Sequence, residues 1–256
     1  MKLYHFTSVN SFLRIWSNQS LKFAEAKNVN DILEASIGVS TPIHSGMRIN
    51  KVNSFHKVLS EYKQISFSKS GGLNSGCFST MMWSHYGDKG NGICLEIESD
   101  LLNLPEPPIV FKGDIQYVDY YPAFKYLPME CNTKKEMYEY VERNPTSYFF
   151  TKTKDWEGES EYRIISRKRS FLCIKDALTR VIIYRWNMPD YDVLDSIIPK
   201  GFPFDVIDWR VGLHPNENAP RLKDVRSFKK MISNNSNPYR AKMIEKQVAE
   251  LLKPFH

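Results

Sequence analysis

The sequence predicts a single α+β domain with short, mostly antiparallel strands and peripheral helices. Short apolar segments of strand length recur between turn residues, one-sided helical patterns occur near both ends, and no repeat or linker divides the chain. Hydrophobic residues make up 42% of the 256 residues. A chain of this length buries roughly 70 to 75% of the surface that it exposes when unfolded. We therefore expect one domain that extends over residues 1–256.

The first 60 residues begin with a strand and a helix. The segment "KLYHFT" alternates as a strand does, and Ser8 is placed to cap the helix that follows. In this helix, which ends near Asn18, apolar residues recur at i, i+3, i+4 and i+7, namely Val9, Phe12, Leu13 and Trp16. A strand, "LKFAE", and a helix from Asn30 or Asp31 come next. Residues 37–60 have little periodicity and predict a polar loop or a mobile lid.

The middle of the chain is expected to be rich in strands. Two short strands, "QISFS" and "GCFST", flank the hairpin loop "KSGGLNSG". The segment "ICLEI" alternates as a strand, and "PEPPIVFKGDIQYVDYYP" predicts a long strand between prolines.

Helices and strands are both expected in the second half. Thr133 and Glu136 have the capping-box spacing at the start of "TKKEMYEYVERN", and residues 145–156 predict a second helix. The strand-like segments that follow are "SEYRIISRK", "FLCI", "RVIIYRW" and "VLDSIIPKG". The chain closes with an amphipathic helix at about residues 239–252.

Composition narrows the class of protein. No apolar run approaches the ~18 residues of a membrane span, and Thr7 and Ser8 interrupt the segment that would be apolar in a secretory signal. We therefore expect a cytoplasmic protein with no membrane partner. The four cysteines form no C-x-x-C pair, which favours reduced thiols over disulfides or zinc. The net charge of +6 permits an anionic partner without requiring one.

Acidic residues occupy every second position of "DWEGESE", at Asp155, Glu157, Glu159 and Glu161. In an extended strand these side chains would share one face, with neighbours about 7 Å apart. Such a series is often a solvated face or an edge that resists aggregation. The alternative is that Glu159 and Glu161 face one cleft, where their proximity would raise the pKa of at least one of them.

The common nucleotide and hydrolase motifs do not occur in the sequence. The segment "GDKGNG" lacks the G-x-G-x-x-G spacing, and the chain contains no phosphate-loop, H-E-x-x-H or G-x-S-x-G motif. Three groups of candidate residues remain: His5 on the first strand, the segment "MMWSHYGDKGNG" and the acidic series. Each also has an ordinary explanation, as a satisfied strand histidine, an aromatic corner and a solvated face.

The order of these groups resembles a known family. The segments "LYHFTS", "CFST", "MWSHYGDKGNGICLEI" and "KTKDWEGESEYRII" are similar to motifs of the bacterial proteins named domain of unknown function 2971. The last family motif has a Lys four residues before W-x-Y-E-x-E-Y-R. Phe6 replaces a usual Tyr in the first motif, and Gly158 stands where Tyr is usual in the last. The matching segments cover about a sixth of the chain.

The family's layout is in turn similar to the split-sheet ADP-ribosyltransferase fold of the His-Tyr-Glu type, in which these three residues surround NAD. The resemblance implies that Glu161 holds the ribose and stabilises its developing positive charge. It also implies that Tyr86 stacks on nicotinamide, that His5 and Thr7 bind the other ribose, and that Glu159 orients or deprotonates the acceptor.

Two cations are candidates for contact with the NAD pyrophosphate. Arg163 follows the Glu-x-Glu pair on the same predicted strand face, where it would either offset the repulsion between the carboxylates or meet the pyrophosphate. Lys89 belongs to a Gly-rich loop whose backbone can approach phosphate closely.

The resemblance thus implies an enzyme that transfers ADP-ribose from NAD to nucleic acid or to a protein side chain, and that acts as a toxin or phage-defence effector. The cationic segment "RLKDVRSFKK" is a candidate nucleic-acid contact or a solvated helix face. Two alternatives remain open. One is a catalytically silent nucleotide- or nucleic-acid-binding module, and the other is a metal-dependent nuclease built on Asp88, Glu159 and Glu161.

Overall fold

The computed structural model describes residues 1–25, 49–71, 75–119, 131–185, 190–208 and 220–234. The strands in this part of the chain are β1 (Lys2–Thr7), β2 (Ser20–Lys22), β3 (Ala24–Glu25), β4 (Lys63–Lys69), β5 (Ile93–Glu98), β6 (Phe111–Asp114), β7 (Gln116–Val118), β8 (Thr151–Thr153), β9 (Glu161–Ser166), β10 (Phe171–Cys173), β11 (Leu178–Ile183), β12 (Phe204–Asp208) and β13 (Arg221–Asp224). The helices are α1 (Val9–Asn18), α3 (Ile49–Ser60), α4 (Thr80–His85), α5 (Lys134–Arg143), α6 (Pro145–Phe149), α7 (Tyr191–Ile197) and α8 (Val225–Asn234).

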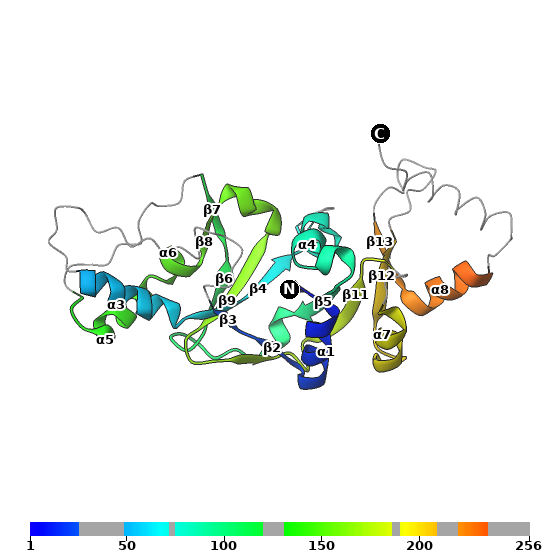
Figure 1. Ribbon diagram of the computed structural model, residues 1–256, viewed down its shortest axis with the longest axis horizontal. Helices are drawn as coiled ribbons and strands as arrows, with labels where there is room; N and C mark the ends of the chain where they lie inside the picture. Colours follow the sequence, from blue (N-terminus) through cyan, green and yellow to red (C-terminus); the bar gives the residue numbers. More distant parts are fainter. Residues whose placement is uncertain (26–48, 72–74, 120–130, 186–189, 209–219, 235–256) are drawn as a thin grey trace.

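Nine of the described strands form one sheet. Its order is β13-β12-β11-β5-β1-β4-β9-β6, with β3 also paired to β4 (Figure 1). Every pair in this sheet is antiparallel except β11 with β12. Two small sheets join β2 to β10 and β7 to β8. The expected α+β class with mostly antiparallel strands is therefore confirmed.

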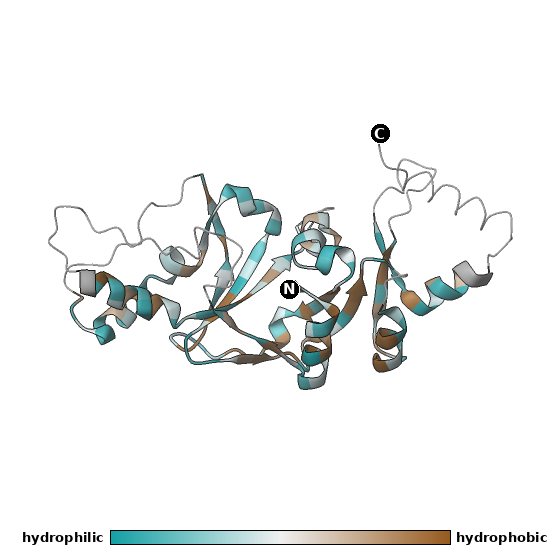
Figure 2. Ribbon diagram, viewed as in Figure 1, coloured by the Kyte–Doolittle hydropathy of each residue, from teal (hydrophilic) through white to brown (hydrophobic). Residues whose placement is uncertain are grey.

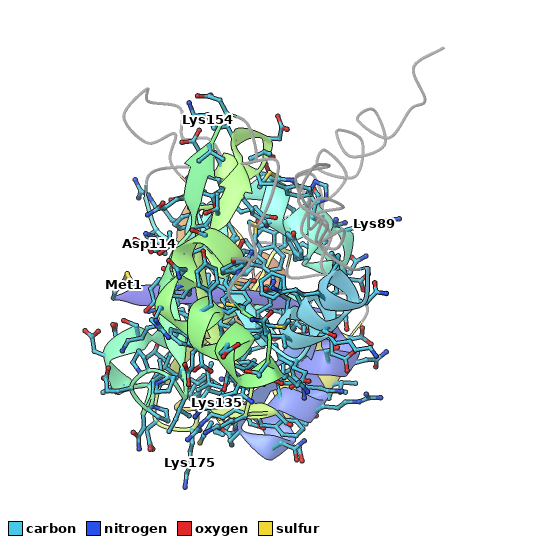
Figure 3. All side chains as sticks on the ribbon, turned by 90° about the vertical axis from the view of Figure 1, so that its left-hand side faces the viewer. Met1, Lys89, Asp114, Lys135, Lys154 and Lys175 are labelled. Atoms are coloured by element: carbon cyan, nitrogen blue, oxygen red, sulfur yellow. The ribbon has the colours of Figure 1, made fainter. Side chains whose placement is uncertain are left out.

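Helices lie at both ends of the sheet and over its centre. Helices α3, α5 and α6 lie at one end, α7 and α8 lie at the other, and α1 and α4 lie between them (Figure 1). Apolar residues are concentrated in central strands such as β11, while α3 and α5 are largely hydrophilic (Figure 2). Charged side chains such as those of Lys135, Lys154 and Lys175 lie at the periphery (Figure 3).

Strand β5 is buried on both faces. Leu95 packs in one core cluster with Phe12 of α1, whereas Cys94 packs in another cluster with Trp83 of α4. This explains why "ICLEI" is nearly all apolar rather than strictly alternating, because a strand covered on both sides needs apolar residues in both directions.

The cap residues act as the sequence predicts. The Ser8 side chain accepts a hydrogen bond from the Ser11 backbone N–H at the start of α1. At the start of α5, Thr133 and Glu136 form the reciprocal capping box. Both helices therefore begin where the sequence places them.

Several expected elements differ in the structure. The segment "GCFST" is not a strand but a 3-10 turn, Gly76–Phe78, followed by α4, whose N-cap is Ser79. Residues 49–60, expected as part of a loop or lid, form α3, and residues 37–48 lie outside the described residues. The predicted helix over 145–156 is only α6, followed by β8.

Two further segments correct the sequence prediction. Residues 193–201, expected as a strand, lie largely in α7, which buries Leu194 in the core. The long strand expected over 105–122 is divided into β6 and β7 at Ile115, whose buried side chain packs in a different cluster from the central core. The helices expected from Asn30 or Asp31 and over 239–252 lie outside the described residues.

The sheet opens between β1 and β4. All six residues of β1 pair with β5, but only Leu3 and Tyr4 pair with β4. Beyond Tyr4 the His5 side chain contacts β4 in place of main-chain pairing: its Nδ1 lies 3.2 Å from the carbonyl oxygen of Ser66. The opening leaves space between two central strands, and the candidate site lies there.

No helix in the described ranges has both the length and the apolar character needed to cross a membrane. The four cysteines are free thiols, as expected.

Candidate functional site

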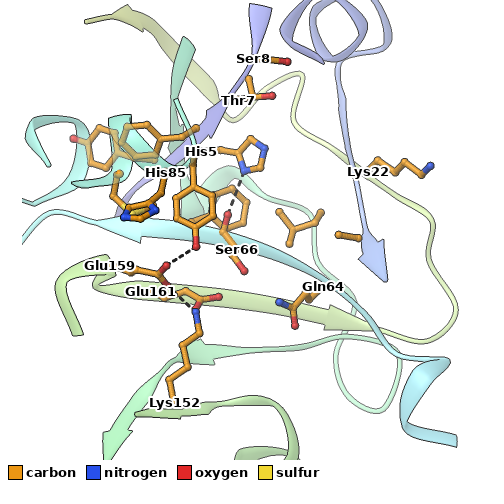
Figure 4. Close-up of a pocket in the computed structure, with 17 residues that line it drawn as sticks. His5, Thr7, Ser8, Lys22, Gln64, Ser66, His85, Lys152, Glu159 and Glu161 are labelled. Atoms are coloured by element: carbon orange, nitrogen blue, oxygen red, sulfur yellow. Dashed lines mark hydrogen bonds and ion pairs between the residues drawn. The ribbon is translucent and has the colours of Figure 1, made fainter. Parts of the chain in front are cut away.

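A cavity of about 430 Å³ occupies the opening between β1 and β4. Five of the predicted site residues line it together, namely His5, Thr7, Tyr86, Glu159 and Glu161 (Figure 4). They come from β1, from the end of α4, from the 3-10 helix Lys154–Glu159 and from the start of β9. The structure therefore brings together residues that are up to 156 positions apart in the chain.

His5 is held in a defined neutral form. A carbonyl oxygen only accepts hydrogen bonds, so the contact with Ser66 places the ring proton on Nδ1 and leaves Nε2 as an acceptor. Burial lowers the pKa of His5, and the bond to Ser66 opposes this only in part. The ring also packs edge-on against Phe67. The strand histidine is thus satisfied on one side and able to accept a hydrogen bond on the other.

The aromatic segment around Trp83 positions Tyr86. The Trp83 indole donates to the carbonyl of Cys77 at 2.7 Å and packs edge-on against Phe6 of β1. This fixes α4 against the sheet and directs Tyr86, which follows the helix, into the cavity. The Tyr86 hydroxyl donates to Glu159 Oε1 at 2.5 Å. The segment is therefore both an aromatic corner and the support of a cavity residue.

The acidic series does not form a strand. Residues 154–159 form a 3-10 helix, and Ser160 has a left-handed backbone with φ of 46° before β9 begins at Glu161. Glu159, at the end of the 3-10 helix, and Glu161, at the start of β9, still line the same cavity. Glu157 is exposed. The sequence predicted that Glu159 and Glu161 face one cavity, but it did not predict the 3-10 helix and the left-handed Ser160 between them.

A buried ionic network joins the two carboxylates. Lys152 Nζ lies 2.7 Å from Glu159 Oε2 and 3.0 Å from Glu161 Oε2. The guanidinium of Arg163 donates to both oxygens of Glu161, each at 2.8 Å, and to the carbonyl of Phe149 at 2.7 Å. All four charged side chains are at most 5% exposed. Two cations therefore balance two anions inside the protein, as a buried charge requires.

The network fixes the charge of Glu161. Burial acts to raise its pKa, but Arg163 and Lys152 outweigh burial and lower the pKa to about 2. Repulsion between the two carboxylates was expected to raise the pKa of at least one of them. At Glu161 the pKa is lowered instead, because Lys152, which was not anticipated here, acts together with Arg163. Glu161 is thus a permanent anion near neutral pH. It suits electrostatic stabilisation and hydrogen-bond acceptance rather than proton uptake.

The two expected pyrophosphate ligands lie elsewhere. Arg163 is buried and does not line the cavity, so Glu161 stands between its guanidinium and the cavity. Lys89 is exposed, with its side chain directed outward at the edge of the molecule, and it is not among the residues that line the cavity (Figure 3).

The nuclease alternative requires a cluster of metal-binding side chains, which is not found among the described residues. Within the described ranges, no group of three or more His, Cys, Asp or Glu side chains is arranged to hold a metal ion. Asp88 is exposed and does not line the cavity with Glu159 and Glu161.

The cationic segment 221–230 spans β13 and the first part of α8. Ion pairs join Lys223 to Asp208, Arg226 to Asp195 and Lys229 to Asp192. These pairs reduce the positive charge that the segment presents to a nucleic acid, which favours its explanation as a solvated face.

Sequence reasoning assigned no role to Lys152 or Ser66. Lys152 belongs to the last family motif, and a lysine seven residues before Glu159 at the end of an apolar segment was the available signal. Ser66 contributes its carbonyl to His5, and its hydroxyl helps lower the Glu161 pKa. Every residue has a main-chain carbonyl, so the sequence does not indicate which one accepts a hydrogen bond from His5.

The comparisons with known proteins give one match. The family model described as "Protein of unknown function (DUF2971)" matches residues 82–164, which include Tyr86, Lys152, Glu159 and Glu161. No curated protein and no solved structure matches the chain. The resemblance to the domain of unknown function 2971 family is thereby confirmed for the stretch from α4 to β9.

Proposed function

We propose that the protein transfers ADP-ribose from NAD to a macromolecular acceptor. The observation that supports this is the convergence of His5, Tyr86 and Glu161 on one cavity at an opening in an antiparallel sheet. The three residues occur in the order expected of an ADP-ribosyltransferase of the His-Tyr-Glu type. A split-sheet core of that type would place its donor in such an opening.

The reaction breaks the bond between ribose C1′ and the nicotinamide nitrogen. The nitrogen keeps the bonding electron pair and nicotinamide leaves as a neutral base, so positive charge develops on the ribose. Glu161 is a fixed anion at the cavity wall and would stabilise that charge as it forms. The acceptor nucleophile then bonds to C1′ and loses its proton to Glu159.

The remaining residues would orient the donor. Tyr86 presents an aromatic ring for nicotinamide while its hydroxyl holds Glu159. His5 Nε2 would accept a hydrogen bond from a ribose hydroxyl, and the neighbouring Thr7 hydroxyl would add a second contact. Lys152, whose Nζ lies 2.7 Å from Glu159 Oε2 and 3.0 Å from Glu161 Oε2, would keep the two carboxylates close together. A role as a cytoplasmic toxin or phage-defence effector is part of this proposal.

One observation favours a second candidate, a catalytically silent nucleotide-binding module. The Glu161 carboxylate interacts with Arg163 through both oxygens, with Lys152 and with the Ser66 hydroxyl. A carboxylate offers about four acceptor positions. A ribose hydroxyl would therefore have to displace one of these partners, and a protein that only binds nucleotides has no need of that exchange.

Transfer from labelled NAD distinguishes these candidates. The protein is incubated with NAD labelled in the adenylate and with separate pools of RNA, DNA and protein. We expect label in one polymer, and we expect Glu159→Gln to reduce it while release of nicotinamide continues. The matched control is Glu157→Gln, which changes an exposed acid of the same 3-10 helix. NAD binding without label in any polymer and without nicotinamide release would favour the silent module.

A further inference from the structure

We propose that a second cavity, beside the first, binds the phosphate and base of an adenine nucleotide. This cavity has a volume of about 420 Å³ and shares His5, Thr7 and Lys22 with the first cavity. A ligand that passes these three residues would occupy both spaces. The choice of adenine and the assignment of the second cavity to the adenylate half of NAD rest on the proposed function, whereas the affinity of the cavity for a nucleotide does not.

One wall of the second cavity is the polar face of α1. Ser11, Arg14, Ile15 and Asn18 line the cavity and recur at i, i+3, i+4 and i+7, so they share one side of the helix. The opposite side buries Phe12 in the core. Ser11, Arg14 and Asn18 on this side are exposed, and Arg14 carries a guanidinium that suits phosphate.

The other wall is the small sheet of β2 and β10. Lys22 and Phe171 are directly opposite in this antiparallel pair, so their side chains lie on the same face with Cβ atoms about 4.5–5.5 Å apart. The next pair in the register, Leu21 and Leu172, is buried. The register thus places a cation and an aromatic ring side by side at the cavity.

Phe171 is unusually exposed for an aromatic residue. Its side chain is 54% exposed although it lines a cavity. An accessible ring next to a cation is a platform for a nucleobase attached to a phosphate, because bases stack on aromatic rings while a cation holds the phosphate.

The charges of the two cavities are complementary to a nucleotide. No Asp or Glu is among the residues that line the second cavity, and neither Arg14 nor Lys22 forms an ion pair within the part of the chain that the structure describes. Glu159 and Glu161 lie at the far side of the first cavity from Thr7, Ser8 and Lys22 (Figure 4). Phosphate would therefore be attracted to the second cavity, and a ribose that becomes cationic to the first.

Calorimetric titration with AMP and with adenosine tests the second cavity. We expect AMP to bind the wild-type protein. Arg14→Gln should weaken AMP binding about tenfold and leave adenosine binding unchanged, because it removes only the phosphate contact. Phe171→Ala should weaken the binding of both AMP and adenosine about tenfold, because it removes the stacking surface. Both residues are exposed, so the variants should fold, and thermal unfolding checks this.

The matched control is Arg143→Gln, which makes the same change on the exposed surface of α5 and should bind AMP as the wild type does. Absence of AMP binding to the wild type, or equal AMP affinity in Arg14→Gln, would overturn the proposal. A single-stranded oligonucleotide that displaces AMP and binds far more tightly would also overturn it, in favour of a nucleic-acid contact.

The proposed function can fail separately. If AMP binds and depends on Arg14 while the protein neither releases nicotinamide nor transfers label, the cavity is a nucleotide site of a protein that is not a transferase.

Discussion

Arg163 holds Glu161 through both carboxylate oxygens, with nitrogen to oxygen distances of 2.8 Å at each. The two residues are 2% and 3% exposed and lie two positions apart on β9. Adjacent same-face residues on a strand are close enough for such a pair, and burial makes it necessary that each charge has its partner. The candidate site is therefore built on a structural ion pair.

Loss of Arg163 should destabilise the protein strongly. Arg163→Gln leaves the Glu161 charge buried with Lys152 as its remaining cation, and removing one partner of a buried pair costs about 3–5 kcal/mol. Urea unfolding measures the free energy of unfolding. Arg143→Gln, at an exposed pair on α5, should change it by less than about 0.5 kcal/mol. Equal stabilities of the two variants would contradict the importance of the buried network.

Acid should lower the free energy of unfolding because Glu161 becomes protonated. Its pKa is about 2 in the folded protein against 4.5 for the ordinary group, so the unfolded chain takes up the proton first as the pH falls. The stability that the ionised carboxylate supplies is present above pH 4.5 and is lost as the pH falls toward 2, by roughly 3 kcal/mol in all. Urea unfolding between these pH values should show a shallower decline in Glu161→Gln. Identical slopes in wild type and variant would show that Glu161 has an ordinary pKa.

His5 should be neutral and protonated on Nδ1. Its pKa lies below the usual 6.5 because the ring is buried, so at pH 6.5 the folded protein keeps the ring neutral while the unfolded chain is half protonated. The stability that His5 supplies therefore declines as the pH falls below 6.5. Nitrogen-15 chemical shifts of the imidazole report the tautomer directly. A protonated ring at pH 6.5, or a proton on Nε2, would contradict the contact with Ser66.

The turn before β5 should not tolerate a side chain at Gly92. A Cβ there would overlap the Thr7 carbonyl oxygen, which is backbone and cannot move aside easily. Gly92→Ala should lower the free energy of unfolding by roughly 1–3 kcal/mol and disturb the cavity wall at Thr7. Gly201→Ala is the control, because nothing lies within 4 Å of its added Cβ. Equal urea midpoints for the two variants would contradict the close approach of these backbones.

Local patterns in the sequence predicted some elements well. The helix after Ser8 and the capping box at Thr133 were correct because cap residues and apolar spacing act within one turn of helix. The prediction of a strand at "VLDSIIPKG" was wrong, because a short apolar run has no clear period. Most of this segment forms α7, which packs Leu194 in the core.

The candidate site was predicted only in part. The motif order indicated that His5, Tyr86, Glu159 and Glu161 would meet, and they line one cavity. Arg163 was expected on the same face as the carboxylates, but Lys152 was not assigned to this place, because its position depends on β8 and the 3-10 helix that follows it. The rise in pKa expected for at least one carboxylate does not occur at Glu161, whose pKa is lowered.

The central claim is that Glu161 acts on NAD in the cavity between β1 and β4. The most direct measurement is the rate of nicotinamide release from NAD by the purified protein, by Glu161→Gln and by Glu157→Gln. We predict release by the wild type, a loss of at least about 100-fold in Glu161→Gln, and an unchanged rate in Glu157→Gln. Thermal unfolding of each variant confirms that it is folded. A folded Glu161→Gln variant that releases nicotinamide at the wild-type rate, or a wild type that releases none with any acceptor pool present, would contradict the claim.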